Sequence, residues 1–281
     1  MPDAFSGVFK LALDGIAQFA LLGLPYDAGS SYRPGARLAP QAIRALSSSL
    51  NACTEDGLDL SQLRASDRGD LALSNRVHPA FSAIETALGT VLEAGTVPLV
   101  LGGDHSVTFP CFKATLARHP GLRLLYLDAH PDLYDRYDGD PSSHACVVRR
   151  VLELDGMEGK RITQVGIRAT TPEQRACARQ HGIRTVPAWE VERFVYASDD
   201  PVYLSFDIDV LDPAFAPGCG NPVPGGLSSR QALSLIQTLK IPVVALDVVE
   251  VNPLLDPSGI TALAAARVVV ELLGSIVRSQ A

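Results

Sequence analysis

Stretches of nearly unbroken apolar residues alternate along the chain with stretches in which apolar residues recur at helical spacing. The unbroken stretches are rich in Val, Leu, Ile and Ala, as expected of strands that are buried on both faces. We predict strands at residues 18–23, 97–101, 122–127, 161–167, 201–206 and 242–248.

The stretches between these strands carry helix signals. Thr171 and Pro172 provide an N-cap and a first-turn proline, and Ser228 provides another N-cap. We predict helices at residues 40–50, 80–94, 173–181, 230–239 and 259–277. The alternation predicts an α/β fold, with helices on both faces of a mostly parallel central sheet. No linker or repeat interrupts it, so we expect a single domain over residues 1–281.

Charge and cysteine content narrow the functional classes. The formal net charge is -7, which makes nucleic acid or an anionic membrane an unexpected partner. We expect neither a leader sequence nor an apolar run long enough to span a bilayer. The 5 cysteines are scattered without a CxxC pair, which favours reduced thiols in the cytoplasm.

Acidic residues and a histidine follow two of the predicted strands. In an extended backbone, alternate side chains share one face, so Asp128, His130 and Asp132 are expected to converge. Asp207 and Asp209 repeat this spacing, and neighbouring carboxylates repel each other unless a cation or a proton separates them. Helix caps or polar turns are the competing interpretation. Five such side chains after two buried strands favour a metal site.

A further imidazole follows the strand at residues 97–101. Gly102 and Gly103 permit a sharp turn that leaves His105 just beyond the strand end, where a solvated N-cap is the alternative. The six candidate ligands fit two ions that share carboxylates better than one. Oxygen-rich ligation without thiolate favours two Mn²⁺ per chain, with Ni²⁺ or Fe²⁺ as alternatives. Such ions can lower the pKa of water from 15.7 to about 7, so hydroxide would be the nucleophile.

Two more residues are candidates for handling the substrate. His144 follows an acid-rich loop, where it is either a solvated side chain or a proton carrier that folds back over the metals. Glu250 follows the last predicted strand, where it is either an exposed loop carboxylate or an anion that orients a planar guanidinium.

The set of motifs resembles the ureohydrolase family, which includes arginases and agmatinases. The resemblance covers nearly the whole chain. It rests on GGDHS (102–106), DAHPD (128–132), SFDIDVLDP (205–213), LPYD (24–27), SYRPGAR (31–37), PQAIR (40–44), PGGL (224–227) and VEVNP (249–253). It implies a three-layer αβα arginase-like fold and a binuclear Mn²⁺ centre.

The resemblance also implies individual roles. His105 and Asp132 would ligate one ion and His130 and Asp209 the other, with Asp128 and Asp207 as bridges. A bridging hydroxide would attack the guanidinium carbon of the substrate to release urea and an amine. Asp132 would help pass the proton, His144 would shuttle it, and Glu250 would pair with the guanidinium.

The resemblance leaves the substrate open. Where arginases carry Gly-Leu-Arg-Asp, this chain has GIRAT at residues 166–170, without an acid, which favours the agmatinase branch. The loop acids Asp135, Asp138 and Asp140 would favour a cationic tail such as that of agmatine, or are ordinary turn residues. Asn221 stands where many members have Thr, beside the guanidinium site, and is expected to influence specificity.

We therefore predict hydrolysis of agmatine or a similar small cationic guanidino substrate, such as guanidinobutyrate, in a homo-oligomer that is a trimer or a hexamer. A formimino-amino-acid hydrolase and an arginase of the same family are the enzyme alternatives. A metal-binding homologue without catalytic activity is the third, although all six ligand positions, His144 and Glu250 are present.

Overall fold

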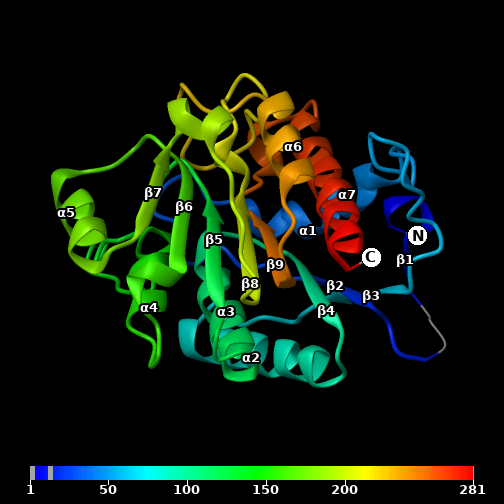
Figure 1. The fold of residues 1–281 in the computed structure, drawn as a ribbon, viewed down its shortest axis with the longest axis horizontal. Coiled ribbons are helices and arrows are strands. Elements are labelled where there is room, and N and C mark those ends of the chain that lie inside the picture. Colours follow the sequence, from blue (N-terminus) through cyan, green and yellow to red (C-terminus); the bar gives the residue numbers. More distant parts are fainter. Residues whose placement is uncertain (1–3, 12–14, 281) are drawn as a thin grey trace.

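The computed structural model describes residues 4–11 and 15–280, in which nine strands form one sheet (Figure 1). The spatial order is β1-β3-β2-β4-β9-β8-β5-β6-β7, and every pair of neighbouring strands is parallel. The strands are β1 (Phe9–Lys10), β2 (Phe19–Gly23), β3 (Ala65–Asp70), β4 (Val97–Leu101), β5 (Arg123–Leu127), β6 (Ile162–Ile167), β7 (Arg184–Pro187), β8 (Val202–Asp207) and β9 (Val243–Val249).

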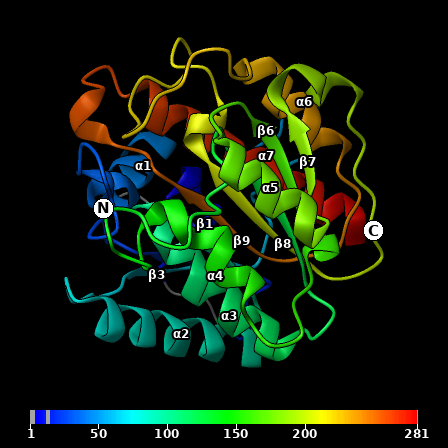
Figure 2. The ribbon, with the colours of Figure 1, turned by 90° about the vertical axis from the view of Figure 1, so that its left-hand side faces the viewer.

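Helices cover both faces of the sheet, which confirms the predicted three-layer α/β architecture (Figures 1 and 2). One layer contains α1 (Ala39–Ser47), α6 (Ser229–Thr238) and α7 (Ile260–Gln280), and the other contains α2 (Val77–Glu93), α3 (Thr108–Arg118), α4 (Val147–Leu152) and α5 (Pro172–His181). Alternate strand residues face opposite layers. In β5, Leu125 packs with the α1–α6–α7 side, whereas Leu124 and Tyr126 pack with the α2–α3–α4 side.

The apolar pattern located the central strands and missed the outer ones. All six predicted strands exist, and β4 has the predicted bounds. The pattern missed β1, β3 and β7, because polar residues interrupt β3 and β7 and β1 is only two residues long. It also missed α3 and α4, since α3 begins Thr-Phe-Pro and α4 has only six residues.

The capping signals are confirmed for two helices. The Thr171 side chain accepts a hydrogen bond from the Gln174 backbone N–H at the start of α5. Ser228 and Gln231 form a reciprocal capping box at the start of α6. Such caps satisfy backbone N–H groups that the first helical turn leaves without partners.

The prediction about apolar runs is wrong for α7. By length and composition, this helix could cross a bilayer, with a mean hydropathy of 1.9 over its most apolar 18 residues. However, 72% of that window is buried inside the protein, where α7 packs against α1 and α6. A helix that is apolar and buried in this way fits a place in the core.

Candidate active site

The site lies at the carboxyl ends of four strands that are adjacent in the centre of the sheet. These strands are β4, β9, β8 and β5, in spatial order. His105 follows β4, Glu250 follows β9, Asp209 follows β8 and Asp128 follows β5. The parallel topology therefore brings together residues that are up to 145 positions apart in sequence. Ligands of open parallel sheets bind at this edge.

The Gly-Gly turn after β4 positions His105 through close backbone packing. A Cβ atom on Gly103 would lie 1.7 Å from the Tyr26 carbonyl oxygen, so no side chain fits there. The Asp104 side chain then accepts from the Ser106 N–H, which begins a short 3-10 helix with His105 as its first residue. The His105 ring is 1% exposed and stacks on Tyr126, with 4.5 Å between ring centroids.

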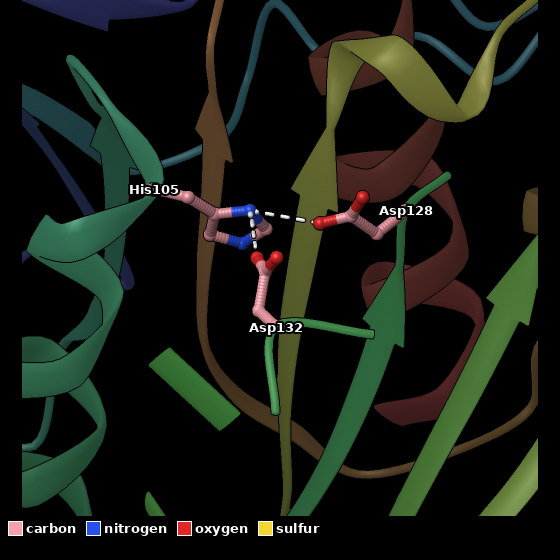
Figure 3. A group of neighbouring side chains, drawn as sticks. All are labelled: His105, Asp128 and Asp132. Carbon is pink, nitrogen blue, oxygen red and sulfur yellow. Dashed lines mark ion pairs between the residues drawn. The ribbon is translucent and has the colours of Figure 1, made fainter. Parts of the chain in front are cut away.

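The first cluster of possible metal ligands contains His105, Asp128 and Asp132 (Figure 3). The His105 Nδ1 atom lies 3.0 Å from an Asp128 oxygen and 3.8 Å from an Asp132 oxygen. Asp207 Oδ2 lies 2.9 Å from the same nitrogen. This cluster brings together the two residues expected at one ion and both expected bridges.

The second cluster contains Asp128, His130 and Asp209. The His130 Nδ1 atom lies 3.0 Å from an Asp209 oxygen and 3.3 Å from an Asp128 oxygen. Asp128 thus belongs to both clusters, as a bridging ligand would. Asp207 Oδ1 accepts a hydrogen bond from the backbone N–H of Asp209, a member of the second cluster.

The reason predicted for this convergence is wrong, although the residues do converge. The strands end at Leu127 and Asp207, and the acidic residues beyond them are not in extended alternation. Asp132 has a φ of 46°, in the left-handed region, and Asp209 lies in a short 3-10 helix. Turns rather than a strand face therefore aim these carboxylates at the histidines.

The arrangement fits two small divalent ions. Ligand atoms about 2.1 Å from such an ion lie roughly 3 Å from one another, as these nitrogen and oxygen atoms do. Asp128 Oδ2 is buried and lies 3.0 Å from His105 Nδ1, but the contact does not have hydrogen-bond geometry. Within the described residues, the ion pairs of these carboxylates involve only histidine, with no lysine or arginine. A cation at each cluster would supply the missing counter-charge.

The pKa shifts reflect this crowding of acids. Burial and the Asp128 charge raise the pKa of Asp132 to about 7, and burial with neighbouring acids raises the pKa of Asp207 well above its ordinary value. Burial opposes protonation of His130, yet the charge of Asp209 and a hydrogen bond to Asp128 raise its pKa to about 12. Like charges held this close together favour either a proton or a bound cation between them.

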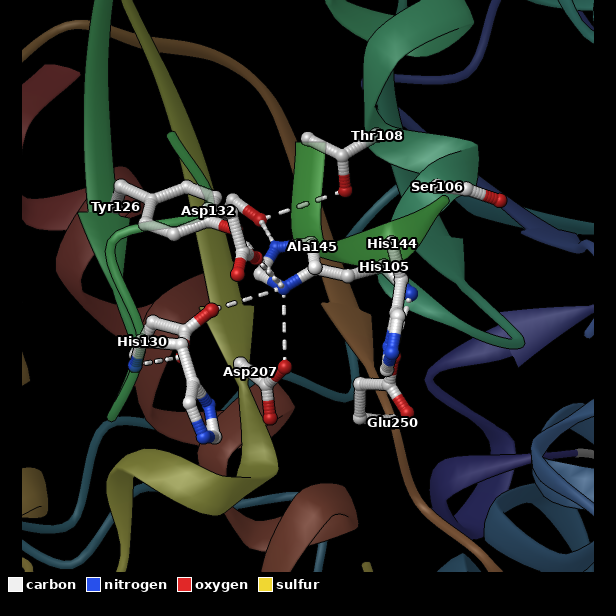
Figure 4. Close-up of polar contacts among 12 residues, drawn as sticks. His105, Ser106, Thr108, Tyr126, His130, Asp132, His144, Ala145, Asp207 and Glu250 are labelled. Carbon is white, nitrogen blue, oxygen red and sulfur yellow. Dashed lines mark hydrogen bonds and ion pairs between the residues drawn. The ribbon is translucent and has the colours of Figure 1, made fainter. Parts of the chain in front are cut away.

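His144 and Glu250 form a buried pair beside the two clusters (Figure 4). His144 Nδ1 lies 2.7 Å from Glu250 Oε1, and the same oxygen accepts from the His105 backbone N–H at 2.8 Å. Burial disfavours the charge on His144, but Glu250 outweighs it and raises the pKa of the imidazole to about 9. The structure thus excludes the simple alternatives of a solvated loop histidine and an exposed loop carboxylate.

A cavity of about 300 Å³ opens over the clusters. Its walls include Ser31, His105, His130, Asp132, Tyr134, Tyr137, His144, Thr170, Thr171, Gln174, Asp207, Asp209, Asn221 and Glu250. Asn221 also lines the cavity, and its buried Oδ1 atom has no hydrogen-bond partner among the described residues.

The loop acids that suggested a cationic substrate tail do not line this cavity. Asp135 pairs with Arg150, and Asp140 accepts from the Ser142 N–H. Asp138 lies in the turn that the sequence suggested, with a φ of 50°. The turn interpretation of these acids is therefore the better one.

Sequence reasoning missed the residues that support His105. His105 Nε2 lies 2.8 Å from Ser205 Oγ, which donates to Asp247 at 2.7 Å. Tyr126 OH lies 3.1 Å from His105 Nδ1 and donates to Asp132 at 2.5 Å. The signal was present as polar groups inside otherwise apolar strands, two positions before Asp128 and Asp207.

Comparison with known proteins agrees with this geometry. The model of the arginase family matches residues 17–274. A guanidinopropionase of Pseudomonas aeruginosa is 40% identical over 94% of this chain and 88% of its own length. The mitochondrial agmatinase of Gallus gallus is 38% identical over 90% of this chain and 79% of its own. The structure of proclavaminate amidino hydrolase from Streptomyces clavuligerus has a TM-score of 0.92 at 34% identity, covering 99% of this chain and 98% of that one.

Proposed function

The chain belongs to the arginase family and is a hydrolase of guanidino compounds, and from this premise we propose that it releases urea from a short guanidino acid. The observation that carries the proposal is the buried Glu250–His144 pair, which faces two His/Asp clusters across one cavity. We propose Mn²⁺ as the metal, because the donor set is rich in oxygen and has no thiolate. The homo-oligomeric state and the cytoplasmic location stay predictions.

Six side chains would hold the two ions. His105 and Asp132 would serve one, His130 and Asp209 the other, and Asp128 and Asp207 both. When bound, the ions supply a hydroxide nucleophile at neutral pH and favour negative charge that develops on the substrate.

The protein's own groups would orient the guanidinium. The Glu250 carboxylate offers acceptor oxygens to a planar fork of N–H donors, which suits a charge-assisted pair. Asn221 lines the same cavity and would offer its unpartnered Oδ1 as a second acceptor after a small side-chain rotation. His144 would donate a proton to the departing amine, because its ring lies against Glu250 and lines the cavity.

The remaining cavity wall favours a carboxylate tail over the ammonium of agmatine. Beyond the acids assigned to the metals and the guanidinium, the wall offers neutral groups such as Tyr134, Tyr137 and Thr170. The start of α5, at Thr171, contributes the positive end of a helix dipole. Among similar proteins, the guanidinopropionase also points to a guanidino acid, and the agmatinase keeps agmatine as the second candidate.

A substrate panel tests the reaction. The full chain with Mn²⁺ should release urea from guanidinopropionate or guanidinobutyrate faster than from agmatine, arginine or guanidine, and chelation should abolish the release. If no compound yields urea, the proposal is wrong, and formamide from a formimino amino acid would point to the alternative hydrolase. A preference for agmatine would contradict only the proposal that the substrate ends in a carboxylate, and the urea-releasing reaction would still stand.

Replacing Glu250 tests the guanidinium site separately from the metals. We expect Glu250→Ala to keep two ions per chain but to lower kcat/KM by roughly a hundredfold, as loss of one well-placed polar contact commonly does. Asp200→Ala, which removes an exposed acid paired with Arg123, is the matched control and should behave like wild type. Wild-type kinetics for Glu250→Ala would place the guanidinium elsewhere.

A further inference from the structure

The His144 ring is held by protein groups at both of its nitrogen atoms. Nδ1 faces Glu250 Oε1 at 2.7 Å, and because an ionised carboxylate can only accept, Nδ1 carries a hydrogen and donates. At the other side, Nε2 lies 3.2 Å from the Ser31 backbone nitrogen and 2.8 Å from Ser31 Oγ. Both nitrogen atoms therefore have a protein partner when no substrate is bound, and these contacts decide how the ring exchanges protons with solvent.

On the Glu250 side, release of the Nδ1 proton to water would require breaking the ion pair with Glu250. The Glu250 side chain is buried, with a relative exposure of 6%, and its Oε1 atom also accepts from the His105 backbone N–H. His144 itself is 8% exposed. Proton exchange with solvent is therefore directed to Nε2 and to Ser31.

Ser31 presents two different groups to Nε2. Its backbone N–H can only donate, so it favours a ring nitrogen without a proton and makes the protonated ring a better donor. Its hydroxyl can donate or accept, so it keeps a hydrogen bond to Nε2 in either protonation state. Ser31 is exposed and lines the cavity, which places the hydroxyl between the buried ring and solvent.

Backbone contacts fix the loop that carries Ser31. The Gly29 N–H donates to Asp104 at 2.7 Å, and the His144 N–H donates to the Gly29 carbonyl at 3.0 Å. A Cβ atom on Gly29 would lie 2.7 Å from Ser106 Oγ, so the packing leaves no room for a side chain. The position of the Ser31 hydroxyl is thus tied to both histidine-bearing segments.

We propose that Ser31 is the proton relay between His144 and water at the mouth of the cavity, a role that rests on the proposed function. In the outward transfer, the Nε2–H bond breaks as a new O–H bond forms on Ser31, and the original hydroxyl hydrogen passes to a water molecule. The inward transfer reverses these steps and restores the proton that His144 gives to the departing amine. Ser31 is unchanged after each transfer.

Kinetics of the Mn²⁺-loaded full chain test the relay. We expect Ser31→Ala to lower kcat by about tenfold, at the low end of proton-transfer effects, with KM within about twofold of wild type. Added imidazole buffer should restore much of the lost rate by exchanging protons with the His144 ring from the mouth of the cavity. Ser31→Thr keeps a hydroxyl and should recover most of kcat. Ser30→Ala is the matched control, because the Ser30 hydroxyl lies 3.5 Å from Asp104 rather than on His144.

The kinetic outcomes separate a relay from a structural role. Buffer rescue of Ser31→Ala, with none for Ser30→Ala, supports the relay. A loss of rate that neither buffer nor Thr restores overturns it, as does a wild-type kcat and pH profile for Ser31→Ala.

A second measurement does not depend on turnover. In the metal-free full chain with ¹⁵N-labelled histidine, exchange of the His144 ring N–H with solvent should slow in Ser31→Ala. Loss of the resonance in His144→Gln assigns it. Unchanged exchange overturns the relay. If wild type releases no urea from any guanidino compound, the proposed function fails, and the exchange rate still decides whether Ser31 carries protons to the ring.

Discussion

Buried carboxylates in two regions of this molecule, helix α7 and the carboxyl edge of the sheet, are compensated in different ways. Glu271 of α7 is 0% exposed, and it accepts from the Glu55 N–H at 2.7 Å and from Gln237 at 3.1 Å, and pairs with Arg267. Asp128 is also 0% exposed, yet among the described residues its Oδ2 atom makes no hydrogen bond and has only the His105 ring, 3.0 Å away, as a possible counter-charge.

The difference distinguishes an acid that is buried as part of the stable fold from acids that are buried in order to bind ions. The helical layer satisfies its acid with the protein's own donors and a guanidinium, as buried charges usually require. The sheet edge gathers four aspartates around two histidines, which leaves the compensation to ions from outside. The Glu250–His144 pair is intermediate, because there the protein provides one cation of its own.

The largest effect should follow removal of the shared carboxylate. We expect Asp128→Asn to reduce metal content below two ions per chain and kcat by about a thousandfold or more, since both clusters lose a charge and the nucleophile depends on the ions. Mn²⁺ should then raise the Tm of the variant less than that of wild type. Two ions and full activity in this variant would reject Asp128 as a bridge; Asp200→Asn is the control.

The Glu250–His144 pair should make the free energy of unfolding of the metal-free chain depend on pH. Glu250 raises the pKa of His144 from 6.5 to about 9, so between these pH values the folded chain holds a proton that the unfolded chain has lost. The free energy of unfolding should therefore fall as pH rises through this window, by about 3 kcal/mol in all. Urea denaturation of wild type and His144→Gln at several pH values isolates this contribution. Parallel profiles for the two proteins would contradict it.

The smallest effect should come from replacing Glu271, whose charge is compensated by other groups of the protein. Glu271→Ala should lower the free energy of unfolding by about 2 kcal/mol, below the usual cost of breaking a buried pair because Arg267 is 26% exposed. The loss should be the same with and without Mn²⁺, and kcat should not change. Glu153→Ala, in a surface pair with Arg149, is the control and should cost less than about 1 kcal/mol. If the loss of stability in Glu271→Ala depended on Mn²⁺, the proposed difference between Glu271 and the metal-binding aspartates would be wrong.

The degree of burial explains which strands could be predicted from the sequence. Strands such as β4 and β8 were predictable because burial on both faces requires an unbroken apolar run. By contrast, β3 and β7 lie toward the edges of the sheet, where residues such as Arg68 and Arg184 remain exposed, so no such run marks them. Polar residues just after buried strands singled out the six candidate ligands, and the structure brings their side chains close together, although their role as ligands stays a prediction.

The backbone conformation and the long-range contacts of the site could not be predicted from the sequence. The left-handed φ of Asp132 cannot be read from residue type, so the predicted extended alternation was wrong. The contacts of Ser31 and Ser205 join segments about 100 residues apart, and a lone serine carries no local signal of them. The loop acids Asp135, Asp138 and Asp140 suggested a cationic substrate tail. Only the structure could show that they lie outside the cavity and have other partners.

The place of β9 in the sheet has a consequence for how the molecule is made. The last strand along the chain lies at the centre of the sheet, between β4 and β8. Until residues 243–249 leave the ribosome, the two halves of the sheet each present an open edge, the kind that pairs with other chains. Insertion of β9 closes both edges and delivers Glu250 to His105 in the same step, so completion of the fold and completion of the site should coincide.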